Sequence, residues 1–337
     1  MRRYLLRRLV QAAIVVAGVV LLTFAVARII PGDPATAYAG PRATKSELER
    51  VRRDFGLDKP AVVQLGDYAS GIVTGDWGTA LHTRRPVLDD LRRVVPPTLE
   101  LVIVALLVAL AVGIPLGLLA ARRGGVADAA VRLLATLSVS APVFLLALVL
   151  QWLFFQKLGL LPVAGEYDPK LDYSSPLTVY THMTLADSLI SGNWPIFKDA
   201  LRHLVLPCLA VAMYPLGAIA MMTRASVLEE LGEDHVRMAR SLGFSERTVV
   251  GRLALRPALN PVVSLVALLF AYAIVNTFLV EEIFNWPGLG SYAVDSIKAL
   301  DVPAIIGVTL FVAVIYVILN LAVDLVQAWL DPRIALR

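Results

Sequence analysis

Long apolar runs alternate with polar segments along the chain, and six of the runs are long enough to cross a membrane. A helix needs about 20 predominantly apolar residues to span the hydrocarbon of a bilayer. The six runs cover residues 9–30, 98–121, 133–155, 204–222, 261–280 and 302–330. Pro115 and Pro142 lie inside two of them and are expected to bend those spans, as prolines do in membrane helices. The pattern predicts an all-α integral membrane protein with six transmembrane helices.

The charges of the polar segments predict how these spans are oriented. Six arginines lie between Arg224 and Arg256, and Arg122 and Arg123 occupy the short turn after the second run. Loops rich in lysine and arginine face the cytoplasm, which places both termini there as well. The other polar segments are then external: residues 31–97, 157–202 and 281–301.

The chain divides accordingly into three parts. Residues 1–30 form a basic N-terminus and the first span, residues 31–97 an external segment, and residues 98–337 a core of five spans with a cytoplasmic loop at 224–258. The opening resembles a signal peptide in its basic start, but its apolar run is longer than the apolar core of such peptides. We interpret it as a retained span.

The arginine-rich loop has the pattern of two short helices with a break between them. Residues 234–242 have helical spacing, and Gly243 supplies the permissive backbone of a helix end. Ser245 is suited to cap the second helix, and Pro257 with Pro261 is expected to stop it before the next span. The loop is predicted to lie on the membrane surface as a helix-turn-helix.

Composition narrows the function classes. The chain is 58% hydrophobic and 17% charged, too apolar for a soluble globule. Its net charge of +4 arises from arginines beside apolar runs, which indicates orientation signals and no nucleic-acid binding. The single cysteine, Cys208, lies in an apolar run, so we expect no internal disulfide and no thiolate metal cluster.

Several short motifs, in order along the chain, resemble those of one family of membrane proteins. They are Pro31-Gly32-Asp33-Pro34, the segments 55–60 and 74–78, Asp234-His235-Val236-Arg237-Met238-Ala239-Arg240-Ser241-Leu242-Gly243, Trp286-Pro287-Gly288-Leu289-Gly290 and Leu330-Asp331-Pro332-Arg333. The set resembles the permease subunit of oligopeptide or dipeptide, binding-protein-dependent ABC importers. Two departures are the absence of a literal Glu-Ala-Ala and Asn260 where Leu or Ile is usual.

The resemblance implies a type I ABC importer permease fold in a bacterial or archaeal cell membrane. The chain has no Gly-x-x-x-x-Gly-Lys-Ser/Thr motif, so ATP and Mg are expected on partner subunits and no cofactor in this chain. The implied partners are a homologous second permease, two cytoplasmic ABC ATPases and an extracytoplasmic substrate-binding protein. Di- and oligopeptides are the implied cargo, with nickel chelates and glutathione as alternatives.

In this family, a short helix of the cytoplasmic loop docks on an ATPase, and the resemblance assigns that role to residues 233–243. Arg237 and Arg240 are expected to contact the ATPase, or alternatively to anchor the loop on the membrane surface. The coupling residues are Asp234, Val236, Arg237, Ala239, Arg240, Gly243 and Pro261.

Polar residues in or at the ends of spans are candidates for the translocation path, because polar groups are costly in a bilayer. The candidates are Asn276, Glu281, Glu282 and Asn320. Hydrogen bonds between helices are an equal alternative for the asparagines, and solvated helix capping for the glutamates. Glu281 and Glu282 are alternatively placed to complement an external binding protein or a substrate amine.

Three other classes of membrane protein are less consistent with the sequence. A secondary transporter would show internal repeats and charged residues near mid-span, and neither is evident. An intramembrane hydrolase would need a Ser/His pair or metal ligands within spans, but the four histidines fall in loops or at a span edge. A membrane scaffold would not require the ordered motifs. Co-purification with an ATPase would separate an importer from all three.

Overall fold

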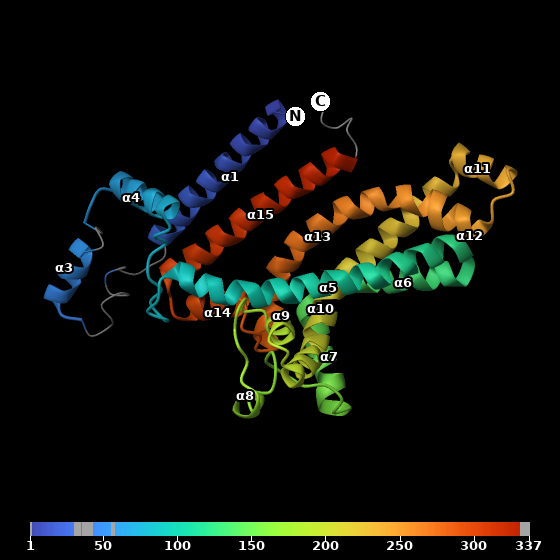
Figure 1. The fold of residues 1–337 in the computed structure, drawn as a ribbon. Helices are drawn as coiled ribbons and strands as arrows, with labels where there is room; N and C mark the ends of the chain where they lie inside the picture. The colour runs from blue at the N-terminus through green and yellow to red at the C-terminus, as the bar shows by residue number, and fades with distance from the viewer. Residues whose placement is uncertain (1, 30–34, 36–42, 55–57, 331–337) are drawn as a thin grey trace. The chain divides into compact units, whose positions relative to one another are not determined.

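The computed structural model describes residues 2–29, 35, 43–54 and 58–330, and its helices are drawn in Figure 1. Among these residues, four helices are long and apolar enough to cross a membrane: Val87–Arg123, Trp194–Leu231, Glu246–Ile283 and Val302–Leu321. A bent pair of helices, Gly125–Ser140 and Val143–Lys157, makes a fifth span if it counts as one. The predicted all-α membrane architecture is confirmed in this coarser form. Some sequence motifs lie outside the described residues: those at 31–34, 55–57 and 331–333.

The chain forms two compact units. Of the described residues, unit 1 comprises those within 2–95 and 291–322, and unit 2 comprises those within 96–290 and 323–330. The helices of unit 1 are α1 (Arg2–Ile29), α3 (Lys45–Asp54), α4 (Ala61–Thr74), the first turns of α5 (Val87–Arg123), and most of α14 (Leu289–Lys298) and α15 (Val302–Leu330). The external segment predicted at 31–97 is thus partly helical, and α5 begins before Thr98, the expected start of the second span.

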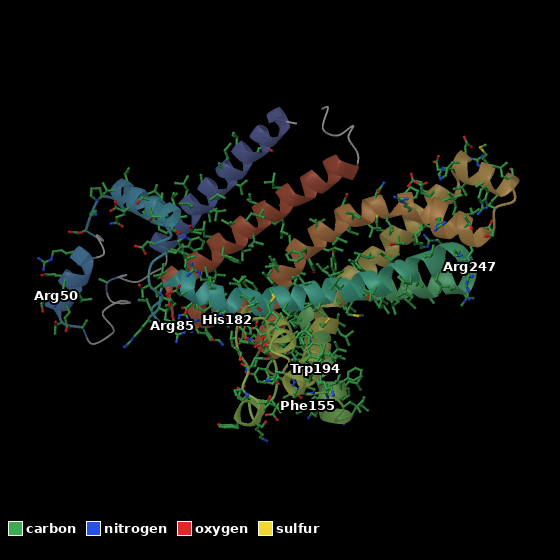
Figure 2. All side chains as sticks on the ribbon, in the orientation of Figure 1. Arg50, Arg85, Phe155, His182, Trp194 and Arg247 are labelled. Atoms are coloured by element: carbon green, nitrogen blue, oxygen red, sulfur yellow. The ribbon has the colours of Figure 1, made fainter. Side chains whose placement is uncertain are left out.

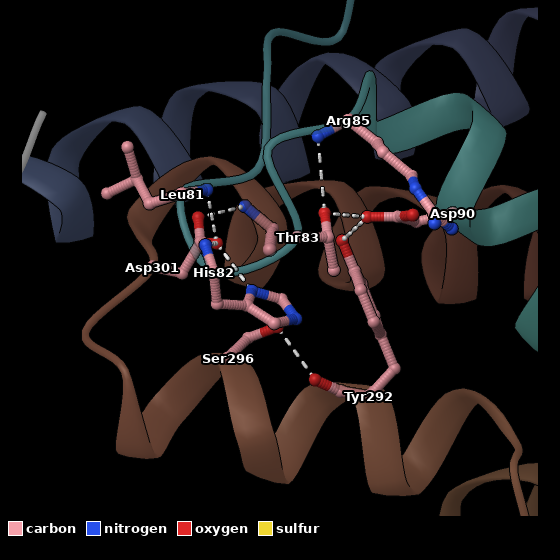
Figure 3. Close-up of polar contacts among 9 residues, drawn as sticks. Leu81, His82, Thr83, Arg85, Asp90, Tyr292, Ser296 and Asp301 are labelled. Carbon is pink, nitrogen blue, oxygen red and sulfur yellow. Dashed lines mark hydrogen bonds and ion pairs between the residues drawn. The ribbon is translucent and has the colours of Figure 1, made fainter.

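Two buried carboxyl groups fix the segment before α5 within unit 1 (Figure 3). Asp301 is completely buried, and its Oδ2 accepts hydrogen bonds from the backbone N–H groups of Leu81 and His82 at 2.6 and 3.0 Å. The same oxygen lies 2.6 Å from Nδ1 of His82, whose ring stands 5.2 Å from the ring of Tyr292. Asp90 in turn accepts a hydrogen bond from the Tyr292 hydroxyl at 3.2 Å. These contacts attach the segment to α14 and to the start of α15.

Unit 2 is built around its longest helix. Its remaining helices are α6 (Gly125–Ser140), α7 (Val143–Leu150), η1 (Gln151–Lys157), α8 (Leu171–Ser174), α9 (Thr184–Ile190), α10 (Trp194–Leu231), α11 (Asp234–Ser241), α12 (Glu246–Thr248), η2 (Val249–Ala254) and α13 (Leu255–Ile283). α10 packs against α6, α7, α9 and α13. Of its most apolar window, 67% is buried, against 39% or less for the other three long helices, so α10 is the central helix of this unit.

The third predicted span is broken where the sequence suggested a kink. α6 ends at Ser140 and α7 begins at Val143, and their axes differ by 104°. Ala141 adopts an extended conformation with ψ of 130°, in line with the steric preference of a residue that precedes proline for extended over helical conformations. Pro142 therefore ends one helix and starts another at a steep angle.

Glycines allow α5 to approach α10 closely. A Cβ atom at Gly117 would lie 2.5 Å from the carbonyl oxygen of Ala220 and 2.7 Å from Cβ of Thr223. A Cβ atom at Gly113 would lie 3.0 Å from the carbonyl oxygen of Leu216. Small residues at such contacts let membrane helices gain van der Waals contact along their backbones.

Gly117→Ala is therefore expected to destabilise the protein by about 1–3 kcal/mol, the usual cost of overpacking, because the obstructing atoms belong to a backbone. Thermal unfolding of the purified, detergent-solubilised complex measures this. Gly66→Ala in α4 is the control, since a Cβ atom there has nothing within 4 Å. Equal stability of Gly117→Ala and the wild type would show that α5 and α10 are not in close contact at this point.

Candidate functional site

The short helix α11 lies in the turn between the two long helices α10 and α13 (Figure 1). It begins at Asp234 and ends at Ser241. Gly243 follows with φ of +81°, a left-handed conformation that favours glycine, and so ends the helix as predicted. The Ser245 hydroxyl accepts a hydrogen bond from the Thr248 backbone N–H at 3.4 Å and caps α12. The predicted pair of short helices with a break is thus present.

One face of α11 is apolar and packs on the chain that follows it. Val236 is completely buried and Ala239 is 6% exposed, and both belong to a cluster with Val249 and Ala254 of η2. Leu231 and Leu253 pack against the same cluster. An isolated helix of eight residues is unstable in water, so this cluster is what keeps α11 folded.

The charged side chains of α11 hold its two ends. Arg237 donates two hydrogen bonds to the carbonyl oxygen of Gly232, at 2.7 and 3.1 Å, and its guanidinium lies 3.4 Å from the carboxylate of Asp234. Arg240 donates to Glu246 at 2.8 Å across the break. The Arg237 side chain is 69% exposed and the Arg240 side chain 41% exposed.

Three exposed apolar side chains of this loop were not among the residues predicted from the sequence. Met238 and Leu242 are each 65% exposed, and Phe244 is 52% exposed. The sequence does carry a signal for them. Val236 and Ala239 already form the apolar face of a short amphipathic helix, so additional apolar residues at 238, 242 and 244 indicate a second apolar surface. The loop therefore carries an inner apolar cluster and a separate exposed apolar patch, which we define as Met238, Leu242 and Phe244.

The prolines after this loop do not stop the second helix, and that prediction was wrong. One continuous helix runs from Glu246 to Ile283, through both Pro257 and Pro261. Residues 249–254 form π-helical turns directly before Pro257. A wider π turn moves the preceding carbonyl groups away from the position where a proline ring would clash with them. Pro261 is an interior residue of α13 and not the boundary of a loop.

The asparagines proposed for the translocation path bond to their own helices. Asn276 is half-buried, and its side-chain amide donates to the Tyr272 carbonyl oxygen at 2.8 Å. Asn320 is exposed and donates to the Tyr316 carbonyl oxygen at 2.8 Å. Asn276 lies in unit 2 and Asn320 in unit 1. The Tyr272 ring stacks on Tyr214 of α10 with centroids 4.2 Å apart, so polar and aromatic groups gather on this part of α13.

Glu281, in the last turn of α13, is enclosed by the motif that follows it. Glu281 is completely buried, and its two carboxyl oxygens accept hydrogen bonds from the Thr98 hydroxyl and the Gly290 N–H, each at 2.6 Å. The Thr98 hydroxyl in turn accepts from the Leu289 N–H at 2.7 Å. A Cβ atom at Gly288 would meet the Glu281 carboxyl at 2.4 Å. We call this arrangement the Glu281 cage.

Two residues next to the Glu281 cage, Trp286 and Glu282, differ in their burial. Trp286 is 2% exposed and donates its indole N–H to the Pro97 carbonyl oxygen at 3.1 Å. Glu282 is exposed, in contrast to Glu281. The two adjacent glutamates, paired by sequence analysis, therefore face different surroundings. Only Glu282 presents its side chain at the surface.

A resident metal site does not emerge from the residues that the structure describes: none of their His, Cys, Asp and Glu side chains form a group of three or more placed to hold an ion. Cys208, within the same described range, is a free and buried thiol. The features present among these residues are helix ends, buried hydrogen bonds and a surface loop.

The chain matches known membrane transport proteins over nearly its whole length. Residues 113–336 match the family described as binding-protein-dependent transport system inner membrane component, and residues 1–102 match the N-terminal part of such membrane components. A probable D,D-dipeptide transport system permease protein of Escherichia coli is 44% identical over 322 residues, which cover 95% of this chain and 94% of that protein.

Two further relatives are similar in extent. A dipeptide transport system permease protein of Alkalihalophilus pseudofirmus is 36% identical over 335 residues, 99% of each chain. A di/tripeptide transport system permease protein of Pseudomonas aeruginosa is 38% identical over 320 residues, 94% of each chain.

Proposed function

This chain belongs to the family of binding-protein-dependent transport system inner membrane components, and from that premise we propose that it forms part of the path by which di- or oligopeptides are imported. It is a permease subunit, and peptides are the cargo named for relatives that match it over nearly their full length. In this proposal, ATP and Mg are bound by partner subunits, and this chain contributes the path and the contact that couples it to them.

Six spans complete the proposed topology. They are α1, α5, the bent pair of α6 with α7 and η1, α10, α13 and α15, with both termini in the cytoplasm of a bacterial or archaeal cell. The side chains of unit 2 support this orientation: Arg247 lies at the α12 end, and Phe155 and Trp194 lie at the opposite end (Figure 2). Arginines mark cytoplasmic loops, and aromatic residues mark membrane interfaces.

The observation that carries the coupling assignment is the two-sided loop around α11. Its inner side is fixed on η2 by Val236 and Ala239, while the patch of Met238, Leu242 and Phe244 is exposed beside Arg237. An apolar patch rimmed by charged residues is the usual composition of a protein-binding surface. We propose that this patch enters a groove on a cytoplasmic ATPase and that Asp234, Arg237 and Arg240 form its charged rim.

The other candidate residues and the polar segments are assigned roles in the same proposal. Asn276, Glu282 and Asn320 are proposed to line the path, and Glu281 to support it from within the protein. The external segments, 31–97, 157–202 and 281–301, are proposed to receive the extracytoplasmic binding protein. A homologous but different second permease and two ATPases complete the assembly. Rigid-body movement of the ATPases would then be transmitted to the spans.

The test is to assemble this permease with its partner permease and ATPases and to measure ATPase co-purification and ATP hydrolysis stimulated by the binding protein. Met238→Glu is expected to reduce both by about tenfold or more, since a charge at the centre of an apolar contact removes more than about 1.4 kcal/mol. Membrane insertion should be unchanged, because Met238 is exposed.

The matched control is Leu160→Glu, which makes the same change at a 58% exposed residue of the proposed external side. ATPase co-purification of Leu160→Glu should equal that of the wild type. If Met238→Glu also keeps full co-purification and stimulated hydrolysis, the coupling assignment is wrong.

A further inference from the structure

Two tyrosine rings stack on each other inside unit 2, one from α10 and one from α13. The centroids of Tyr214 and Tyr272 are 4.2 Å apart, and the ring planes differ by 27°. Tyr214 lies near the middle of the apolar run 204–222. Tyr272 lies near the middle of the run 261–280. Because the rings are in contact, both tyrosines lie at one depth of a membrane that these two helices are long enough to cross.

The hydroxyl groups of this pair have no hydrogen-bond partner among the residues that the structure describes. Tyr272 is 39% exposed, and Tyr214 is half-buried. A buried tyrosine hydroxyl usually finds a partner within the protein. In membrane proteins, tyrosine concentrates at the two interfaces, where the hydroxyl reaches water. A pair at mid-depth meets neither condition, which indicates that a polar medium and not hydrocarbon covers it.

Asn276 adds a third polar group with free capacity on the same side of α13. It lies one turn after Tyr272, and its side-chain amide donates to the Tyr272 carbonyl oxygen at 2.8 Å. Its side-chain oxygen has no partner within the described part of the chain. A hydroxyl both donates and accepts, and an amide oxygen accepts. The three side chains together therefore offer donors and acceptors to a ligand.

The same spacing of tyrosine and asparagine recurs in unit 1. Tyr316 lies near the middle of the apolar run 302–330 and is 48% exposed. Asn320, one turn later, donates to the Tyr316 carbonyl oxygen at 2.8 Å, as Asn276 does to Tyr272. Polar side chains are costly in the hydrocarbon of a bilayer. Their recurrence at this spacing in two spans argues against a surface that is covered by lipid alone.

We propose that Tyr214, Tyr272 and Asn276 form a contact site for the peptide as it crosses the membrane. The two hydroxyls and the asparagine oxygen exchange hydrogen bonds with the N–H and C=O groups of the peptide backbone. All di- and oligopeptides share these groups, so the site accepts peptides of different sequence. The stacked rings keep the hydroxyls in place, because each ring limits the rotation of the other.

The composition of the two spans favours weak binding at this site. The apolar runs 204–222 and 261–280 contain no Asp, Glu, Lys or Arg, so they offer no ion pair to the charged ends of a peptide. A hydrogen bond between neutral groups replaces one to water and strengthens binding by about tenfold or less. Such a site stabilises a peptide in passage and releases it easily.

This inference rests on the proposed function and deepens it, because the ligand of the site is the proposed cargo. The exposure of the site to water can be measured without any cargo. Uptake of a peptide is a separate measurement. The two together distinguish a wrong site from a wrong cargo.

The first test places a cysteine beside the site in the assembled transporter and measures its reaction with a charged, water-soluble thiol reagent. Leu268→Cys is the reporter, since Leu268 lies one turn before Tyr272 and is 61% exposed. Leu107→Cys is the matched control: Leu107 is 59% exposed and lies near the middle of the apolar run 98–121. Cys208, the single cysteine of the chain, is buried and gives a low background.

We expect the reagent to modify Leu268→Cys and not Leu107→Cys. Leu107 has only apolar residues, Ile103 and Ala111, as its exposed neighbours one turn away on α5. The dipeptide Ala-Ala, supplied with binding protein and ATP, should slow the modification of Leu268→Cys, because a peptide at the site excludes the reagent.

The second test removes the two hydroxyls and keeps the stacked rings, by combining Tyr214→Phe with Tyr272→Phe. Uptake of Ala-Ala into proteoliposomes that contain the assembled transporter should fall by about tenfold. Membrane insertion and the thermal unfolding temperature of the complex should equal those of the wild type, because the hydroxyls have no partner among the described residues.

Three outcomes would overturn the proposal. Equal modification of Leu268→Cys and Leu107→Cys, or of neither, would show that this face is no more accessible to water than the rest of the helix surface. A lower unfolding temperature of the double tyrosine variant would mean that the second permease bonds to the hydroxyls. Undiminished uptake by that variant would exclude a contact with the peptide. A wild-type transporter that imports neither Ala-Ala nor Ala-Ala-Ala would instead count against the proposed function.

Discussion

Val236→Asp is expected to unfold α11 and to abolish the association with the ATPases. Val236 is completely buried among Ala239, Val249 and Ala254. The change removes about 1.5–3 kcal/mol of apolar burial and adds the cost of an unpaired buried charge. Because the helix has only eight residues, the hydrogen bonds of Arg237 and Arg240 at its ends are not expected to keep it folded without this cluster.

Hydrogen–deuterium exchange of residues 234–243 in the assembled complex measures the local unfolding, and co-purification measures its effect on the ATPases. His235→Asp is the control, because it introduces the same group at the next residue, which is half-exposed. That variant should keep α11 protected from exchange. Protection of α11 in Val236→Asp would mean that the inner cluster does not hold the helix.

Glu281→Ala is expected to have the largest effect on the stability of the permease itself, about 3–5 kcal/mol. The carboxyl group is completely buried and accepts from both Thr98 and Gly290. Its removal leaves these two donors without an acceptor, at about 1–3 kcal/mol each, and opens a cavity. The contact between the start of the second predicted span and the end of α13 would be lost.

Thermal unfolding of the detergent-solubilised complex tests this prediction, with Glu282→Ala as the matched control. Glu282 is the adjacent residue and is exposed, so its replacement should change the stability by less than about 0.5 kcal/mol. Similar losses in the two variants would argue against a structural role specific to Glu281. A peptide-uptake assay of both variants then shows whether the loss of transport activity parallels the loss of stability.

The parts of the fold that sequence predicted well are those set by local chemistry. Span-length apolar runs identified α5, α10, α13 and α15 because a bilayer-spanning helix needs one uninterrupted apolar stretch. Gly243 and Ser245 marked the break after α11, since their backbone and hydroxyl preferences act within a few residues.

What could not be predicted depends on distant parts of the chain. Glu281 and Glu282 look alike in sequence, and their difference arises from Thr98, which lies 183 positions away. Pro257 and Pro261 were expected to end a helix, but α13 runs through both, and π turns directly precede Pro257.

The π turns of η2 also set the rotational position of the loop around α11 relative to the helix α13 that follows. A π turn accommodates one residue more than an α-helical turn. Deleting one residue from Val249–Ala254 would allow an ordinary α-helix, but it would rotate everything before it by about 100° around the axis of α13. The patch of Met238, Leu242 and Phe244 would then point away from its present direction. The direction that the loop faces around the axis of α13 is therefore determined by the length of this six-residue segment.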